Sequence, residues 1–104
     1  DLNIKTYFIV HDDNDKCPTH TFLTFEKNNK YYWFEHSWEI CRGIHEYKSE
    51  KELLLDVKQK FIKYELNNNY VKNNLYIYRY DKPKYHITTQ EFYNHATQDI
   101  ILLK

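Results

Sequence analysis

The sequence lacks the features that mark several classes of protein. It has no run of about eighteen apolar residues and no signal peptide, so we expect a soluble, cytoplasmic protein that does not enter a membrane. Fifteen acidic residues balance fifteen basic ones, and this zero net charge argues against nucleic acid as a partner. The two cysteines, Cys17 and Cys41, are too few and too unpatterned for a disulfide framework.

Methionine is absent, and glycine occurs once, at Gly43. Because the chain opens at Asp1 without an initiator methionine and soon enters strand-like sequence, we expect a fragment, a processed product or a partly ordered longer protein. The 104 residues are enough for one small domain with a single core. Eleven tyrosines, six phenylalanines and two tryptophans make that core unusually aromatic.

Short runs of β-branched and aromatic residues predict the strands. We expect strands at Lys5–His11, Thr19–Glu26, Lys30–Ser37 and Leu75–Tyr80. The first run is apolar on both faces, which is typical of a central strand. Residues 38–47, interrupted by Gly43, are expected to be irregular, and the apolar tail at residues 100–103 is either a last strand or a helix end.

Capping signals predict two helices. Ser49 followed by Glu52 is a capping box, and the segment Glu50–Leu66 carries an apolar stripe. This helix should end at the asparagines 67–69. A second possible box, Thr88 with Glu91, opens a short helix near the C-terminus. The sequence therefore predicts one α+β domain over residues 1–104: an antiparallel β-sheet with one long helix and a short C-terminal helix packed against it.

The hairpin at residues 19–37 holds a histidine and a carboxylate at its open end. A two-residue turn at Asn28-Asn29 pairs Lys27 with Lys30, because asparagine tolerates the positive φ angles of such a turn. In that register His20 lies diagonal to Glu35 on the same face of the sheet. A turn one residue earlier would place the two residues directly opposite, and a three-residue loop would send them to opposite faces.

The same hairpin resembles a known family. His20–Phe22 (HTF), a turn, and Lys30–Trp38 (KYYWFEHSW) are similar to the C-terminal part of the core domain in the transglutaminase-like superfamily, which has a papain-like cysteine-protease fold. That family shows a His-small-aromatic strand, a turn, a "KWY" segment and then Asp-Pro-Thr-Trp. His20 falls on the catalytic histidine, Glu35 on the orienting aspartate and Ser37-Trp38 on the Thr-Trp.

The resemblance implies thiol-dependent acyl transfer to, or hydrolysis of, a peptide or protein amide, without a cofactor or metal. His20 would be the base and Glu35 the orienting acid. Two departures are Glu35 in place of aspartate and His36 where proline is frequent. The third is that the family's nucleophilic cysteine opens an upstream helix, which the nineteen residues before His20 do not predict. Either this cysteine precedes Asp1 or the chain is inactive.

Other thiols and other functions stay open. Cys17 is a possible nucleophile three residues before His20, although acidic neighbours oppose thiolate formation. Cys41 follows the hairpin beside Arg42, which could lower its pKa, but a semi-buried thiol is the plainer interpretation. The plainer interpretation of the pair itself is an ordinary strand-end histidine beside a solvated acid, in a non-catalytic binding or structural fragment of the same fold.

Two further groups of residues are candidate binding sites. A metal-binding loop would draw on His11, Asp12, Asp13, Asp15, Cys17 and His20. Their spacing matches no strong zinc or calcium pattern, so a hydrated loop is the better interpretation. A stacking surface would draw on Tyr76, Tyr78 and Tyr80, beside Arg79 and Lys82. The neutral net charge argues against a nucleic-acid groove, so rings that cover the sheet or meet a helix are the better interpretation.

Overall fold

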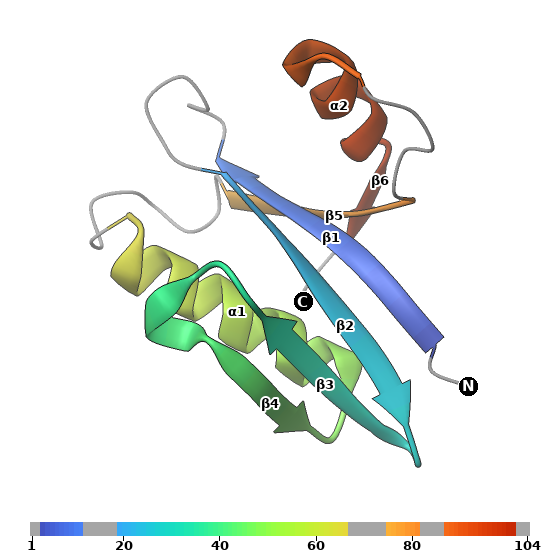
Figure 1. Cartoon of the computed structure of the whole chain (residues 1–104), viewed down its shortest axis with the longest axis vertical. Coiled ribbons are helices and arrows are strands. Elements are labelled where there is room, and N and C mark those ends of the chain that lie inside the picture. Colours follow the sequence, from blue (N-terminus) through green and yellow to red (C-terminus); the bar gives the residue numbers. More distant parts are fainter. Residues whose placement is uncertain (1–2, 12–18, 67–74, 82–86, 102–104) are drawn as a thin grey trace.

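A computed structural model describes residues 3–11, 19–66, 75–81 and 87–101. Within these residues six strands form one antiparallel sheet in the order β4-β3-β2-β1-β5-β6 (Figure 1). The strands are β1 (Asn3–His11), β2 (His20–Lys27), β3 (Lys30–Glu35), β4 (Gly43–Tyr47), β5 (Leu75–Tyr80) and β6 (Asp99–Ile101). The helices are α1 (Glu50–Tyr64), α2 (Thr89–Ala96) and the short 3₁₀ helix η1 (Glu39–Cys41). The predicted α+β fold, with one long and one short C-terminal helix, is confirmed.

The helices cover opposite faces of the sheet, and β1 contributes to both interfaces. Tyr7 and Ile9 belong to the large core under α1, whereas Phe8 and Val10 pack with α2. Because β1 pairs with β2 on one side and β5 on the other, it is the central strand that its two apolar faces predict. Among the described residues, neither helix has the length and apolar character needed to span a bilayer.

The β2–β3 hairpin has the predicted register. Asn28 and Asn29 have φ angles of 55° and 64°, and Lys27 pairs with Lys30. Positive φ at both central residues gives the tight turn whose twist matches that of the flanking strands. Leu23 accordingly pairs with Phe34 at the far end of the ladder, so the parity that places His20 and Glu35 on one face is preserved.

The expectation that residues 38–47 are irregular is wrong, because this segment forms η1 and the edge strand β4. The sequence GIHEY lacks the alternation of apolar and polar residues that predicts a strand. Its one aliphatic side chain, Ile44, points to solvent and is 61% exposed, while His45 and Tyr47 face the sheet's buried side. An edge strand whose ladder is satisfied on one side only can form with this weak pattern.

The capping predictions locate both helices. The Ser49 hydroxyl accepts a hydrogen bond from the Glu52 amide at 3.1 Å, and Thr88 with Glu91 forms a complete capping box. The long helix ends at Tyr64, at least three residues before its predicted end at the asparagines 67–69, which lie outside the described residues. The C-terminal tail is a strand as far as it is described.

Glu50 joins the start of α1 to two strands. Its carboxylate accepts hydrogen bonds from Lys5 Nζ at 2.9 Å, from the Tyr7 hydroxyl at 3.0 Å and from an Arg79 guanidinium nitrogen at 3.0 Å. Burial alone would raise the pKa of Glu50, but these donors and cations lower it below its usual range. The half-buried network therefore fixes how the helix sits on β1 and β5.

Gly43 should resist substitution for backbone reasons alone. Its φ of +126° is rare for L-residues, although a Cβ would meet no atom within 4 Å. We expect Gly43→Ala to lower the free energy of unfolding by about 1–3 kcal/mol in urea denaturation. Ile44→Ala, on the exposed face of the same strand, is the control and should change it by less than about 1 kcal/mol. Equal stabilities of wild type and Gly43→Ala would show that β4 relaxes without strain.

Candidate active site

The structure brings His20 and Glu35 together. The Nε2 atom of His20, at the start of β2, lies 2.7 Å from Oε1 of Glu35, at the end of β3. The Glu35 side chain is 2% exposed and that of His20 is 15% exposed. The alternative of a solvated strand-end acid is therefore wrong, because the carboxylate is buried and its partner is the imidazole.

Three donors converge on the Glu35 carboxylate. Oε1 accepts from the Trp33 indole at 3.2 Å as well as from His20, and Oε2 accepts from the backbone amide of Trp38 at 2.9 Å. Burial raises the pKa of Glu35, but the hydrogen bonds from His20, Trp38 and Trp33 outweigh burial and bring the pKa below its ordinary value. The carboxylate is therefore ionised at neutral pH.

An ionised carboxylate determines which imidazole nitrogen carries the proton. A carboxylate can only accept hydrogen bonds, so the Nε2 of His20 must be the donor. In the neutral ring this leaves Nδ1 with the lone pair. The ring also packs edge-on against Trp38 at 5.3 Å between centroids and stacks on Phe22 at 6.4 Å. The site thus holds one imidazole in one tautomer and one orientation.

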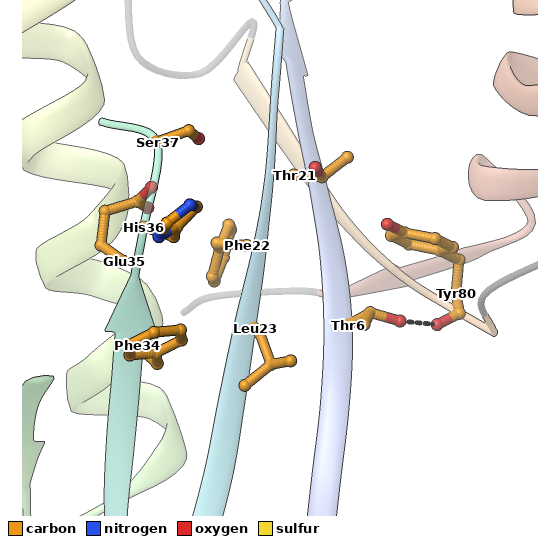
Figure 2. Close-up of a pocket in the computed structure, with 9 residues that line it drawn as sticks. All are labelled: Thr6, Thr21, Phe22, Leu23, Phe34, Glu35, His36, Ser37 and Tyr80. Atoms are coloured by element: carbon orange, nitrogen blue, oxygen red, sulfur yellow. Dashed lines mark hydrogen bonds between the residues drawn. The ribbon is translucent and has the colours of Figure 1, made fainter. Parts of the chain in front are cut away.

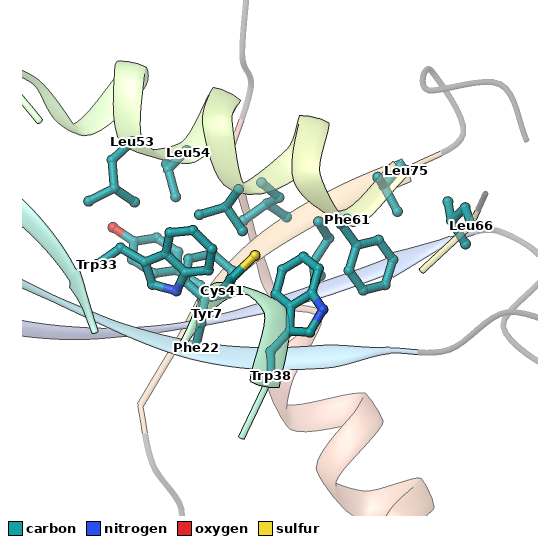
Figure 3. Packing of buried hydrophobic residues seen from close by; sticks show 13 residues of the cluster. Tyr7, Phe22, Trp33, Trp38, Cys41, Leu53, Leu54, Phe61, Leu66 and Leu75 are labelled. Carbon is teal, nitrogen blue, oxygen red and sulfur yellow. The ribbon is translucent and has the colours of Figure 1, made fainter. Parts of the chain in front are cut away.

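The pair contacts the aromatic core through Phe22, Trp33 and Trp38, which Figure 3 shows among the buried residues under α1. Trp33 is fully buried and stacks on His45 with 4.5 Å between ring centroids, and Trp38 meets Phe61 of α1 edge-on at 6.1 Å. Sequence reasoning missed Trp33 and the Trp38 amide as partners of Glu35. The signal for Trp33 was present, because a residue two positions before Glu35 on a strand shares its face.

The cysteines do not complete the site within the described residues. Cys41 is 3% exposed, and burial raises the pKa of its thiol. Neighbouring carboxylates raise this pKa further, whereas Lys60 lowers it. The lower pKa that Arg42 could have given is not found, because the pKa of Cys41 is raised; the Arg42 Nε donates to the His36 carbonyl at 3.1 Å. Cys41 is therefore a buried thiol, as in the plainer interpretation, although it is more deeply buried than that interpretation supposed. Cys17 lies outside the described residues.

The alternative binding sites receive little support from the geometry. In the described ranges no three His, Cys, Asp or Glu side chains gather as metal ligands do, and the loop at 12–18 falls outside those ranges. Tyr78 and Tyr80 pack against α2 with Phe92, so the interpretation of these tyrosines as rings that cover the sheet or meet a helix is confirmed for both. Lys82 lies outside the described residues.

Two cavities flank the start of β2. One, of about 310 Å³, is an open groove on the face that α2 partly covers (Figure 2). It is lined by Thr6, Thr21, Phe22, Leu23, Phe34, Glu35, His36, Ser37 and Tyr80. The other, of about 500 Å³, lies between the same end of β2 and the first turns of α2, with His20 in its lining. Both cavities adjoin the pair, and Thr21 lines each of them.

Comparison with family models, with curated proteins and with solved structures gives no match for this chain. The geometry of the site and the resemblance of the hairpin are therefore the grounds on which a function can be proposed.

Proposed function

We propose that this chain carries the histidine–carboxylate part of a transglutaminase-like, thiol-dependent acyl transferase or amidohydrolase. The observation that carries the proposal is the 2.7 Å contact between His20 Nε2 and a buried Glu35 carboxylate that two further donors hold in place. This arrangement leaves Nδ1 of His20 as a base, as acyl transfer by a weakly acidic nucleophile requires.

The reaction would run in two steps. Nδ1 of His20 takes the proton of a cysteine thiol while the sulfur attacks an amide carbon, and the imidazolium returns the proton to the leaving amine. Water or a second amine, deprotonated by His20, then attacks the thioester and releases the thiol. Glu35 stabilises the imidazolium through the Nε2 hydrogen bond in both steps.

The thiol of this mechanism comes from outside the described residues. Burial and a raised pKa make Cys41 a poor nucleophile. Cys17 is the weaker candidate, because its acidic neighbours oppose thiolate formation. We therefore place the nucleophile on a cysteine encoded before Asp1, with a peptide or protein amide as substrate and no cofactor. A cytoplasmic location suits this chemistry, because reducing conditions keep the thiol available.

A thiol-directed probe tests the proposal on the full-length gene product, including the sequence encoded before Asp1. His20→Ala should slow labelling of the nucleophile by about 10²- to 10⁴-fold, the contribution of a positioned base. The matched control is His95→Ala, an exposed histidine in α2 that lines neither of the two cavities, which should label at the wild-type rate. Equal labelling of His20→Ala and wild type would instead favour the alternative of a non-catalytic binding or structural relative.

A further inference from the structure

Trp33 contacts the His20–Glu35 pair, but the proposed reaction gives Trp33 no role. Its indole N–H donates to Oε1 of Glu35 at 3.2 Å, the oxygen that also accepts from His20 at 2.7 Å. The two donors together use both lone pairs of that oxygen. The Trp38 amide holds the second oxygen, Oε2, at 2.9 Å. The plane of the carboxylate is therefore fixed from both ends.

The indole that makes this contact cannot easily move. Trp33 is fully buried, stacks on His45 at 4.5 Å and meets the rings of Trp38 and Phe22 at 6.0 and 6.4 Å. A side chain confined on this many sides keeps its one N–H bond vector constant. A donor held in one direction stabilises an ionised acceptor more than a mobile donor does. The reason is that the donor does not have to reorient when charge develops nearby.

We propose that Trp33 is a positioning residue: its indole N–H fixes the Glu35 carboxylate in the orientation that presents Oε1 to the His20 imidazole. The catalytic consequence of this role rests on the proposed function, but the contact itself is a property of this chain. Among the described residues, His20 of β2 bonds to Glu35 and Cys41 of η1 interacts with it electrostatically, while His45 of β4 stacks on Trp33 itself.

The chain contains two tryptophans, so the contact can be followed by NMR without a variant. The Trp33 indole proton should resonate downfield, exchange slowly with water, and move upfield as the Glu35 carboxyl is protonated in acid. The 13C signal of that carboxyl should titrate at the same pH. An indole proton that does not respond to this titration would overturn the proposal.

A pair of matched variants separates the N–H group from the ring. Trp33→Phe keeps an aromatic ring in the core but removes the donor, and should raise the titration midpoint of Glu35 by about one pH unit, a tenfold change in its proton dissociation. Trp38→Phe removes an indole from the same core but leaves the backbone amide on Oε2, and should leave the midpoint within about 0.3 pH units. Equal shifts in both variants would assign the effect to core packing and overturn the proposal.

Thiol labelling of the full-length protein distinguishes this inference from the proposed function. Labelling slowed in Trp33→Phe, together with the raised Glu35 midpoint in the same variant, would support the positioning role. A shifted Glu35 midpoint with labelling independent of His20 would overturn the proposed function and leave the Trp33 contact established. Labelling that depends on His20, with no shift in Trp33→Phe, would overturn the inference alone.

Discussion

Glu35→Gln should slow thiol labelling of the full-length protein by about 10³- to 10⁴-fold, although glutamine has almost the shape of glutamate. The reason is that the three hydrogen-bond partners of this carboxylate among the described residues are all donors. His20 and Trp33 donate to Oε1, and the Trp38 amide donates to Oε2. An amide offers one acceptor oxygen and one NH₂ group, so it cannot satisfy all three.

Each orientation of the glutamine has a distinct cost. With its oxygen toward His20 and Trp33, the NH₂ group faces the Trp38 N–H, and two buried donors repel. With the NH₂ group toward His20, the imidazole must accept through Nε2 and move its proton to Nδ1. The second orientation therefore removes the lone pair that serves as base in the proposed reaction.

The measurement compares Glu35→Gln with Glu46→Gln. Glu46 is a 53%-exposed acid on β4 whose partner is Lys30 at 3.0 Å. Glu46→Gln should therefore leave the rate of thiol labelling almost unchanged. 15N spectra of the imidazoles in the same samples report which nitrogen of His20 carries the proton. A Glu35→Gln variant with the wild-type tautomer and labelling rate would show that a buried charge at this position is unnecessary.

The geometry of the pair could be predicted because it depends on local rules. The Asn28-Asn29 turn sets the register, and the two-residue period of a strand then puts His20 and Glu35 on one face. The longer carboxylate also suits this register, since diagonal residues lie about 7–8 Å apart at the backbone. A glutamate in place of the family's aspartate is therefore compatible with the 2.7 Å contact.

The support of the pair could not be predicted, because it depends on where the chain turns after β3. The Trp38 amide reaches Glu35 only after the bend at residues 36 and 37, for which no turn signal was recognised. The edge strand β4 was missed because Ile44 faces solvent and His45 faces Trp33. Tertiary packing determines both the bend before Trp38 and the edge strand β4, and such packing cannot be inferred from hydrophobic periodicity.

Phe61→Ala should produce the largest loss of stability among the changes considered, about 3–5 kcal/mol in the free energy of unfolding. Phe61 is fully buried in α1 and packs on Trp38 with 6.1 Å between ring centroids at 74°. Its removal deletes apolar contacts and leaves a cavity between the helix and the sheet. Since small domains are stable by about 5–15 kcal/mol in total, the urea midpoint should fall by a large fraction.

Tyr64, one turn further along α1, is the matched control. Its ring also meets Trp38 edge-on, at 6.4 Å and 79°, but it is 36% exposed. Tyr64→Ala should therefore cost no more than about 1.5 kcal/mol, because the aromatic contact is similar and the buried area is smaller. Equal losses in the two variants would attribute the stability to the ring contacts with Trp38. A loss confined to Phe61→Ala would attribute it to burial, and the hairpin that carries His20 and Glu35 would then depend on α1 chiefly for its apolar cover.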